Sequence, residues 1–306
     1  MPIKLLAFPY LALCNIIQLM GLSSIIILSI CSRKALRIVK SVRWNTHIYR
    51  YELSRTCLRM IINRGGPINL KFGRHVTTNT FYKLNDEVVK FELEKTPFEV
   101  RKGPVLESKN YIVFVSMEEQ REIASTVFHN YIVDIFGSCS NIKLHIKDCH
   151  FHPPLPPMEA LSDTVLSGDQ MRTDYFEALL TKYPNQNSIS IYTFLDREPN
   201  NQIIDGIKNI FWRTSLDYAR LALLNFNGNN MVLRMANINN QDIIQFLRDW
   251  VSNRKYQNLE TISIKSLEDN ILNVVEILQE FTVFNYDPDR RPENYEYDPK
   301  QNDQIN

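Results

Sequence analysis

Four side chains that can bind zinc lie within eight residues near the middle of this 306-residue chain. They are His145, Cys149, His150 and His152, and imidazole and thiolate are preferred ligands of zinc. A structural zinc site usually takes its ligands from two separate turns, and the sequence contains no second cluster of this kind. We therefore predict no metal and no cofactor, and we interpret the segment as a strand that ends in the rigid proline-rich loop 153–157.

Sequence patterns typical of catalysis are also missing. The chain has no G-x-S-x-G elbow, no phosphate-binding P-loop, no G-x-G-x-x-G and no H-E-x-x-H motif. Serine, histidine and aspartate are plentiful, but no spacing among them implies a shared geometry. We expect a protein that binds rather than catalyses, and an undetected hydrolase is the least favoured alternative.

The charge balance limits the kinds of partner that we expect, and the cysteine content indicates the cellular compartment. With 35 basic and 34 acidic residues, the chain has no global field to attract nucleic acid or an anionic membrane, so we expect neither as a partner. The number of cysteines is odd and they are scattered, which argues against a disulfide framework: Cys14, Cys31, Cys57, Cys139 and Cys149. Reduced thiols predict a cytoplasmic and/or nuclear protein.

The longest uncharged stretch runs from Leu5 to Ser32, and a basic segment beginning at Arg33 follows it. About 20 apolar residues cross a bilayer, so a signal anchor over residues 5–30 is one interpretation, and a signal peptide is another. A proline at position 9 and Gly21, followed by two serines, divide the stretch into short pieces. This punctuation favours short helices over one membrane span.

We expect three short helices before residue 46. Pro9 can begin the first helix, where its missing N–H costs little, and Gly21 can stop it. Ser23 or Ser24 can cap the second helix, and Ser32 can cap the third. The third helix would carry a basic face formed by Arg33, Lys34, Arg37 and Lys40.

The stretch FPYLALCNIIQLMGLSSIIILSICSRKALRIVK resembles an F-box domain. The opening Leu-Pro of that family is similar to Phe8-Pro9, and its first-helix apolar pair is similar to Ile16-Ile17. Its Val-Ser-Lys-Arg stretch is similar to residues 31–34. The sequence departs from the family at Leu11 and Ser24, where acidic residues are frequent.

This resemblance implies that residues 1–45 bind the Skp adaptor of a cullin ubiquitin ligase. The residues to which it assigns adaptor binding are Phe8, Pro9, Leu13, Ile16, Ile17, Met20, Ile25 and Leu28. Burial of each large apolar side chain would contribute about 1.5 to 3 kcal/mol before the entropy of association is subtracted. The alternative is that these side chains form only the core of the chain itself.

We expect residues 46–155 to form a strand-rich linking region with one helix. A helix over 118–136 follows from a capping box at Ser116 and Glu119 and would end at Gly137. Its expected buried face is Ile123, Val127, Phe128, Tyr131, Ile132 and Ile135. Alternating polar and apolar residues, or short apolar runs, predict strands at Phe81–Leu84, Val89–Leu93, Tyr111–Val115 and Ile142–Ile146. We expect the first two of these strands to form a hairpin. This order predicts an α/β layer.

Residues 156–285 continue the alternation. We expect strands at Ile189–Tyr192, Arg220–Leu224, Met231–Met235 and Leu259–Ile264. We expect one helix through Tyr175–Leu180 and another over Leu267–Phe281. Between them we expect a helix that Asn239 or Asn240 caps, with a buried face formed by Ile243, Phe246, Leu247 and Trp250. Leu233 aligns with Ile262 at a spacing of 29 residues, within the range of leucine-rich repeats. The predicted fold class is α+β or α/β: a three-helix F-box followed by an irregular leucine-rich-repeat-like α/β domain.

The stretch from Phe211 to Ile264 resembles the F-box-associated type 2 domain. The residues that carry this resemblance are Leu216-Asp217, Asn239–Asp242, Phe246-Leu247 with Trp250, and Leu259-Glu260. Together the two resemblances imply a substrate-recognition subunit of a Skp-cullin-F-box ubiquitin ligase whose domain 156–285 binds an unidentified protein target. Residues 286–306 are an acidic polar tail that we expect to be disordered.

Overall fold

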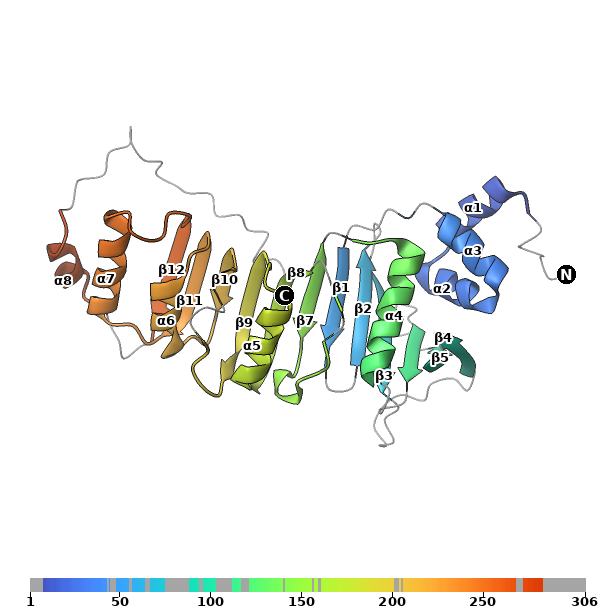
Figure 1. The fold of residues 1–306 in the computed structure, drawn as a ribbon, viewed down its shortest axis with the longest axis horizontal. Helices are drawn as coiled ribbons and strands as arrows, with labels where there is room; N and C mark the ends of the chain where they lie inside the picture. The colour runs from blue at the N-terminus through green and yellow to red at the C-terminus, as the bar shows by residue number, and fades with distance from the viewer. Residues whose placement is uncertain are drawn as a thin grey trace. The chain divides into compact units, whose positions relative to one another are not determined.

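The computed structural model describes residues 8–282, except 43, 45–47, 55–56, 64–66, 75–87, 94–95, 103–111, 117–120, 140, 156, 159–160, 201–203, 205 and 268–271. The chain forms two compact units, Met1–Arg197 and Glu198–Asn306, whose helices and strands are labelled in Figure 1. Unit 1 contains the N-terminal helices and a mixed sheet, and unit 2 alternates parallel strands with helices.

Three short helices begin unit 1, as the residue pattern predicted. They are α1 (Tyr10–Leu19), α2 (Leu22–Cys31) and α3 (Arg33–Ser41). Pro9 immediately precedes α1, and its carbonyl accepts the N–H of Leu13 at 2.9 Å. The hydroxyl of Ser32 accepts the N–H of Ala35 at 3.1 Å, so the predicted cap of α3 is confirmed.

The cap predicted for the second helix is wrong. α2 begins at Leu22, with Gly21 in an extended conformation at the N-cap and no side-chain cap. Only Met20 and Gly21 separate α1 from α2, so the serines at positions 23 and 24 already lie within the first turn of α2. The stretch considered as a signal anchor therefore forms two short helices. Within the described part of the chain, no helix is both long enough and apolar enough to cross a membrane.

A mixed sheet forms the body of unit 1, with strand order β9-β8-β7-β1-β2-β3-β6-β5-β4. The strands are β1 (Ile48–Leu53), β2 (Cys57–Asn63), β3 (Pro67–Arg74), β4 (Val88–Leu93), β5 (Thr96–Lys102), β6 (Ile112–Ser116), β7 (Ile142–Ile146), β8 (Leu161–Met171) and β9 (Ser188–Leu195). β1, β7, β8 and β9 pair in parallel, as do β3 and β6, whereas β1–β2, β2–β3, β4–β5 and β5–β6 are antiparallel.

The strands predicted at 89–93, 111–115, 142–146 and 189–192 correspond to β4, β6, β7 and β9. The predicted hairpin partner Phe81–Leu84 lies outside the described residues, and β4 instead pairs with β5. β1 and β2 lie in a part of the chain, residues 48–63, to which the sequence patterns assigned no particular element.

Two helices of unit 1 lie on one face of this sheet, α4 (Arg121–Phe136) and α5 (Thr173–Lys182) (Figure 1). The predicted helix 118–136 is thus present over its described part, and Gly137 ends it in a left-handed conformation with φ of 85°. Val127, Phe128, Ile132 and Ile135 are buried as expected. Ile123 is exposed, contrary to the prediction, because it lies in the first turn of α4, before the buried stripe begins at Val127.

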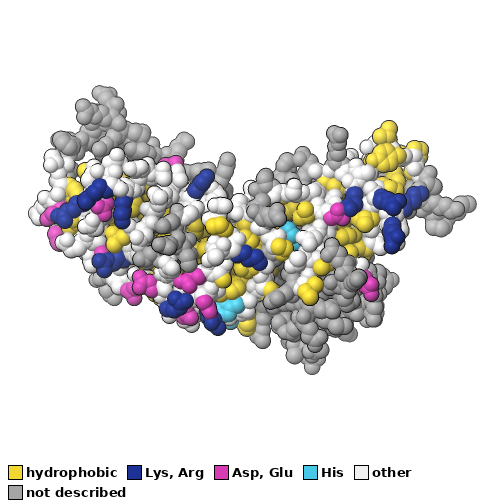
Figure 2. All heavy atoms as spheres, viewed as in Figure 1, with side chains coloured by type: hydrophobic (Ala, Val, Ile, Leu, Met, Phe, Trp, Pro, Cys, Tyr) yellow, Lys and Arg dark blue, Asp and Glu magenta, His cyan; other side chains and the backbone are white. Residues whose placement is uncertain are grey.

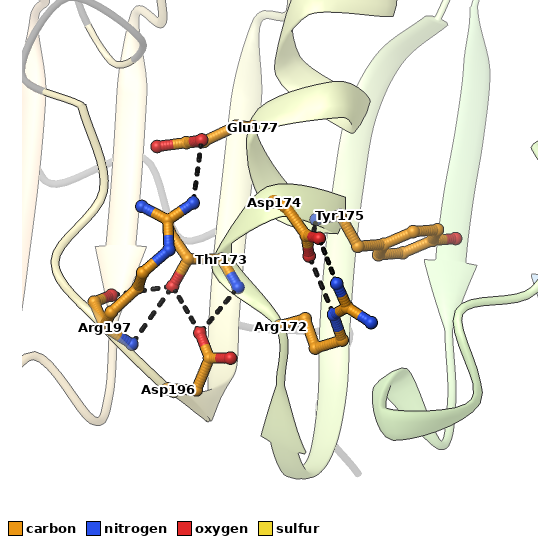
Figure 3. A network of polar contacts seen from close by, with 7 residues as sticks. All are labelled: Arg172, Thr173, Asp174, Tyr175, Glu177, Asp196 and Arg197. Atoms are coloured by element: carbon orange, nitrogen blue, oxygen red, sulfur yellow. Dashed lines mark hydrogen bonds and ion pairs between the residues drawn. The ribbon is translucent and has the colours of Figure 1, made fainter.

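A polar network joins the end of β9 to the start of α5 (Figure 3). The backbone N–H of Thr173 donates to Oδ1 of Asp196 at 2.8 Å, and the Thr173 hydroxyl lies 2.7 Å from the carbonyl oxygen of Arg197. Hydrogen bonds from Thr173 lower the pKa of Asp196. Asp196 therefore caps a helix from a neighbouring strand and holds α5 against the sheet.

Unit 2 contains β10 (Asn209–Trp212), α6 (Tyr218–Asn225), β11 (Asn230–Ala236), α7 (Asn240–Val251), β12 (Thr261–Ser266) and α8 (Val274–Gln279). β10, β11 and β12 pair in parallel. The strand predicted at Arg220–Leu224 is wrong, because these residues lie in α6. A short apolar run such as Leu221–Leu223 does not distinguish a strand from a buried helical turn, and all three side chains are buried here.

The predicted alignment of β11 with β12 is shifted by two residues. Leu233 pairs with Ile264, and Met231 pairs with Ile262. Met235 has φ of 52° and lies where the register shifts, so it cannot continue the ladder.

Asn239, one of the two residues predicted to cap this helix, is the N-cap of α7 and forms a capping box with Asp242. Asn239 and Asp242 each accept the backbone N–H of the other, at 3.0 and 3.1 Å. Phe246 is buried as predicted, but Trp250 is half exposed because it lies in the last turn of α7 and stacks on Phe246. Ile244, which was not predicted, is buried instead.

Candidate functional site

The inner sides of α1, α2 and α3 form a small apolar core. Leu13 and Ile17, one turn apart on α1, are buried, and so are Ile25 of α2 and Val39 of α3. This spacing turns one side of α1 and one side of α2 toward α3. Three predicted adaptor-binding residues, Leu13, Ile17 and Ile25, therefore lie inside the chain in this structure.

The opposite side of α1 carries apolar side chains that lie in solvent. Leu11 is 77% exposed and Leu19 is 89% exposed, and Phe8 and Tyr10 are also exposed. Figure 2 shows hydrophobic side chains gathered over α1. A cluster of large apolar side chains on a surface is typical of an interaction site. We call Leu11 and Leu19, together with Phe8 and Tyr10 at the start of the helix, the outer apolar cluster.

The predicted site residues thus fall into two groups. Phe8 and Pro9 are exposed, whereas Ile16, Met20 and Leu28 are partly exposed. Tyr10, Leu11, Leu19 and Ile27 are also exposed apolar side chains of these helices, and they were not among the predicted residues. A helical projection alone could have separated Leu11 from the Leu13–Ile17 stripe, but it could not have shown which side faces the rest of the chain.

A basic side of α3 lies opposite its buried residues Ala35 and Val39. Its members are exposed: Arg33, Lys34, Arg37 and Lys40. Lys40 forms an ion pair with Asp134 of α4, with 2.6 Å between Nζ and Oδ1. Figure 2 shows the basic side chains next to the apolar ones over α1.

Several contacts hold the three helices against α4. The hydroxyl groups of Ser29 and Tyr131 lie 2.7 Å apart, and burial raises the pKa of Tyr131 to about 12. Trp44, which follows α3, donates its indole N–H to the carbonyl of Val39 at 2.9 Å and packs edge-on against Phe136. The three N-terminal helices and the segment after them are thus attached to α4 by a hydrogen bond, an ion pair and an aromatic contact.

The histidine and cysteine cluster does not form a shared site. His145 lies on β7, with Nε2 3.0 Å from the hydroxyl of Ser167, and burial lowers its pKa to about 4. Cys149 is buried, which raises the pKa of its thiol to about 12. His152 accepts the backbone N–H of Arg172 at 3.3 Å. Among the residues that the structure describes, no three His, Cys, Asp or Glu side chains are grouped as metal ligands.

Comparison with known protein families gives a match to the F-box domain over residues 5–47. The three N-terminal helices therefore form an F-box domain, as their residues predicted. F-box domains bind Skp-type adaptors in cullin ubiquitin ligases. No curated protein and no solved structure matches the chain.

Proposed function

We propose that this protein is the substrate-recognition subunit of a Skp-cullin-F-box ubiquitin ligase. The observation that carries the proposal is the F-box domain at residues 5–47. In this role the chain binds two proteins, the Skp adaptor and a target. The chemistry of ubiquitin transfer belongs to other subunits.

The outer apolar cluster is the part of the F-box that we assign to the adaptor interface. Its side chains are already in solvent, so an adaptor can cover them without unfolding the three helices. The partly exposed Ile16, Met20 and Leu28 extend this surface. Leu13, Ile17 and Ile25 then act indirectly, because their burial fixes the helices that present the surface. Each fully covered large side chain contributes about 1.5 to 3 kcal/mol to such an interface.

The target-binding part is assigned to the C-terminal α/β region, as an F-box-associated type 2 domain. Support comes from the residues that carry that resemblance. Asn237 donates its side-chain amide to Asp217, which ties the turn before α6 to the turn after β11.

A leucine-rich-repeat-like character is also proposed for this region. A ladder of polar side chains links the starts of its parallel strands: Asn230 Nδ2 lies 2.8 Å from Asn209 Oδ1, and Thr261 Oγ1 lies 2.6 Å from Asn230 Oδ1. Such a repeated link suits a stack of similar strand-helix units.

Adaptor capture tests the proposal directly. We expect the full chain to bind a purified Skp adaptor, and the Leu11→Asp/Leu19→Asp double variant to bind at least about tenfold more weakly, because two desolvated carboxylates are costly at an apolar interface. The exposed positions of Leu11 and Leu19 leave the fold intact, which circular dichroism checks. Binding is measured by calorimetry or surface plasmon resonance.

Val251 supplies the matched control, because it is 72% exposed on α7 in unit 2. The Val251→Asp variant should bind the adaptor like the wild type. Absence of binding by the wild-type chain would refute the proposed function. Equal binding by the wild type and the Leu11→Asp/Leu19→Asp variant would refute the assignment of the interface.

A further inference from the structure

Charge is distributed unevenly along this chain. The whole sequence is nearly balanced, with 35 basic and 34 acidic residues. The F-box segment 5–47, however, contains five basic residues and no acidic one. The basic residues are Arg33, Lys34, Arg37, Lys40 and Arg43. The F-box therefore presents positive charge that no carboxylate of its own can neutralise.

The structure concentrates this charge on one side of α3. Ala35 and Val39 point inward, so Arg33 and Arg37, one turn apart, share the exposed side. Lys40 is already neutralised by Asp134. Within the described part of the chain, the ion pairs do not include Arg33 or Arg37. These two guanidinium groups are exposed and can face a partner.

We infer that Arg33 and Arg37 pair with an acidic surface of the Skp adaptor, next to the apolar contact made by α1. The inference rests on the proposed function, since it names the chemistry of the partner at the same domain. α1 packs on α3, and the basic side chains lie beside the hydrophobic ones in Figure 2. An apolar centre with charges at its rim is the usual composition of a protein interface.

A carboxylate-bearing protein surface fits these residues better than an anionic lipid. Two cations give only weak attraction to a membrane surface, and that attraction is strongly screened by salt. At a protein interface the same charges act mainly on the rate of encounter and on the choice of partner, while apolar burial supplies the affinity. We therefore expect the basic side to speed association with the adaptor rather than to slow dissociation.

The test compares association rates of the full chain with the purified Skp adaptor across a range of salt concentrations. The wild-type rate should fall as salt rises. The Arg33→Glu/Arg37→Glu variant should associate about tenfold more slowly at low salt and lose most of this salt dependence, while its dissociation rate changes little. The Arg33→Lys/Arg37→Lys variant should keep most of the wild-type rate, because it keeps the charge.

Lys208→Glu/Arg213→Glu is the matched control, because it changes the net charge equally at exposed positions in unit 2. This control should associate like the wild type. Circular dichroism and thermal melting establish that each variant is folded. If Arg33→Glu/Arg37→Glu is misfolded, the milder Arg37→Gln variant is used for the same measurement.

The outcomes separate the two proposals. A wild-type chain that does not bind the adaptor refutes the proposed function. A wild-type chain that binds at a rate insensitive to both salt and the Arg33→Glu/Arg37→Glu change refutes only this inference. This inference is also refuted if the Arg33→Glu/Arg37→Glu variant associates normally with the adaptor but loses binding to phosphatidylserine vesicles, because the two arginines then bind a lipid surface.

Discussion

Burial favours the neutral form of both His145 and Cys149, although it moves their pKa values in opposite directions. The pKa of His145 falls to about 4 and that of Cys149 rises to about 12. The imidazole of His145 is therefore uncharged near neutral pH, and the Cys149 thiol is a poor nucleophile there. In unit 1, Cys149 is buried and His145 is partly buried in β7, so these two side chains pack against the sheet rather than meeting at one site.

Because the pKa of His145 is low, we expect the protein to lose stability in acid. Between pH 6.5 and 4 the unfolded histidine binds a proton that the folded one does not, so stability is lost as pH falls through this range. We expect the wild type to lose about 2 kcal/mol more than the His145→Gln variant between pH 7 and 4.5, after allowance for partial exposure. Urea unfolding at the two pH values measures the difference.

Glutamine retains a polar group that can reach Ser167 but does not titrate, so carboxylates that titrate in the same range affect both proteins equally. Parallel losses of stability in the wild type and the His145→Gln variant would contradict the assignment of a low pKa to His145.

At the scale of elements, the attachment of the F-box to α4 has the clearest functional consequence. Ser29 of α2 donates to the carbonyl of Ile26 at 2.7 Å, which leaves its oxygen to accept the Tyr131 hydroxyl. The Lys40–Asp134 pair is more exposed and contributes less to stability. A fixed F-box would hold a bound adaptor in one orientation relative to the sheet of unit 1.

A double-mutant cycle tests the Ser29–Tyr131 contact. Ser29→Ala and Tyr131→Phe should each lower the free energy of unfolding by about 1 kcal/mol, and the double variant should lose clearly less than their sum, because both remove one hydrogen bond. Urea denaturation supplies the free energies.

Tyr175→Phe is a suitable control for this cycle, because the Tyr175 hydroxyl donates to the carbonyl of Pro153 and not to Ser29. Its effect should add to that of Ser29→Ala. Additive effects of Ser29→Ala and Tyr131→Phe would show that the two hydroxyl groups are not coupled.

At the scale of the molecule, both the F-box and the helix on which it packs belong to unit 1, Met1–Arg197. The proline-rich loop chosen from the sequence as a boundary lies within this unit, because β8 after the loop pairs with β7 before it. The division into a linking region 46–155 and a domain 156–285 stays a prediction.

Unit 1 should therefore bind the adaptor without unit 2. We expect a chain of residues 1–197 to be folded by circular dichroism and to bind the Skp adaptor within about threefold of the full chain, since the F-box and its α4 contacts are retained. A folded 1–197 chain that fails to bind would show that unit 2 contributes to the interface. Target binding should be lost in this shortened chain.

Local signals in the sequence were sufficient for several elements of this fold. The hydroxyl of Ser32 and the Asn239–Asp242 box mark helix starts, and Gly137 marks a helix end, because each satisfies backbone groups a few residues away. The long apolar period of α4 and the resemblance of residues 8–40 to an F-box rest on the same kind of short-range pattern. These features depend little on what the rest of the chain does.

Tertiary structure decided what short-range patterns leave open. The run Arg220–Leu224 is helical, and its central residues Leu221–Leu223 are buried in α6. β1 is a strand whose alternating Tyr49, Tyr51 and Leu53 are buried in the core. The pairing of Leu233 with Ile264 depends on the register shift near Met235. The side of α1 left in solvent is likewise set by packing among helices. Burial and register join residues that are distant in the chain, so neither can be read from the spacing of nearby residues alone.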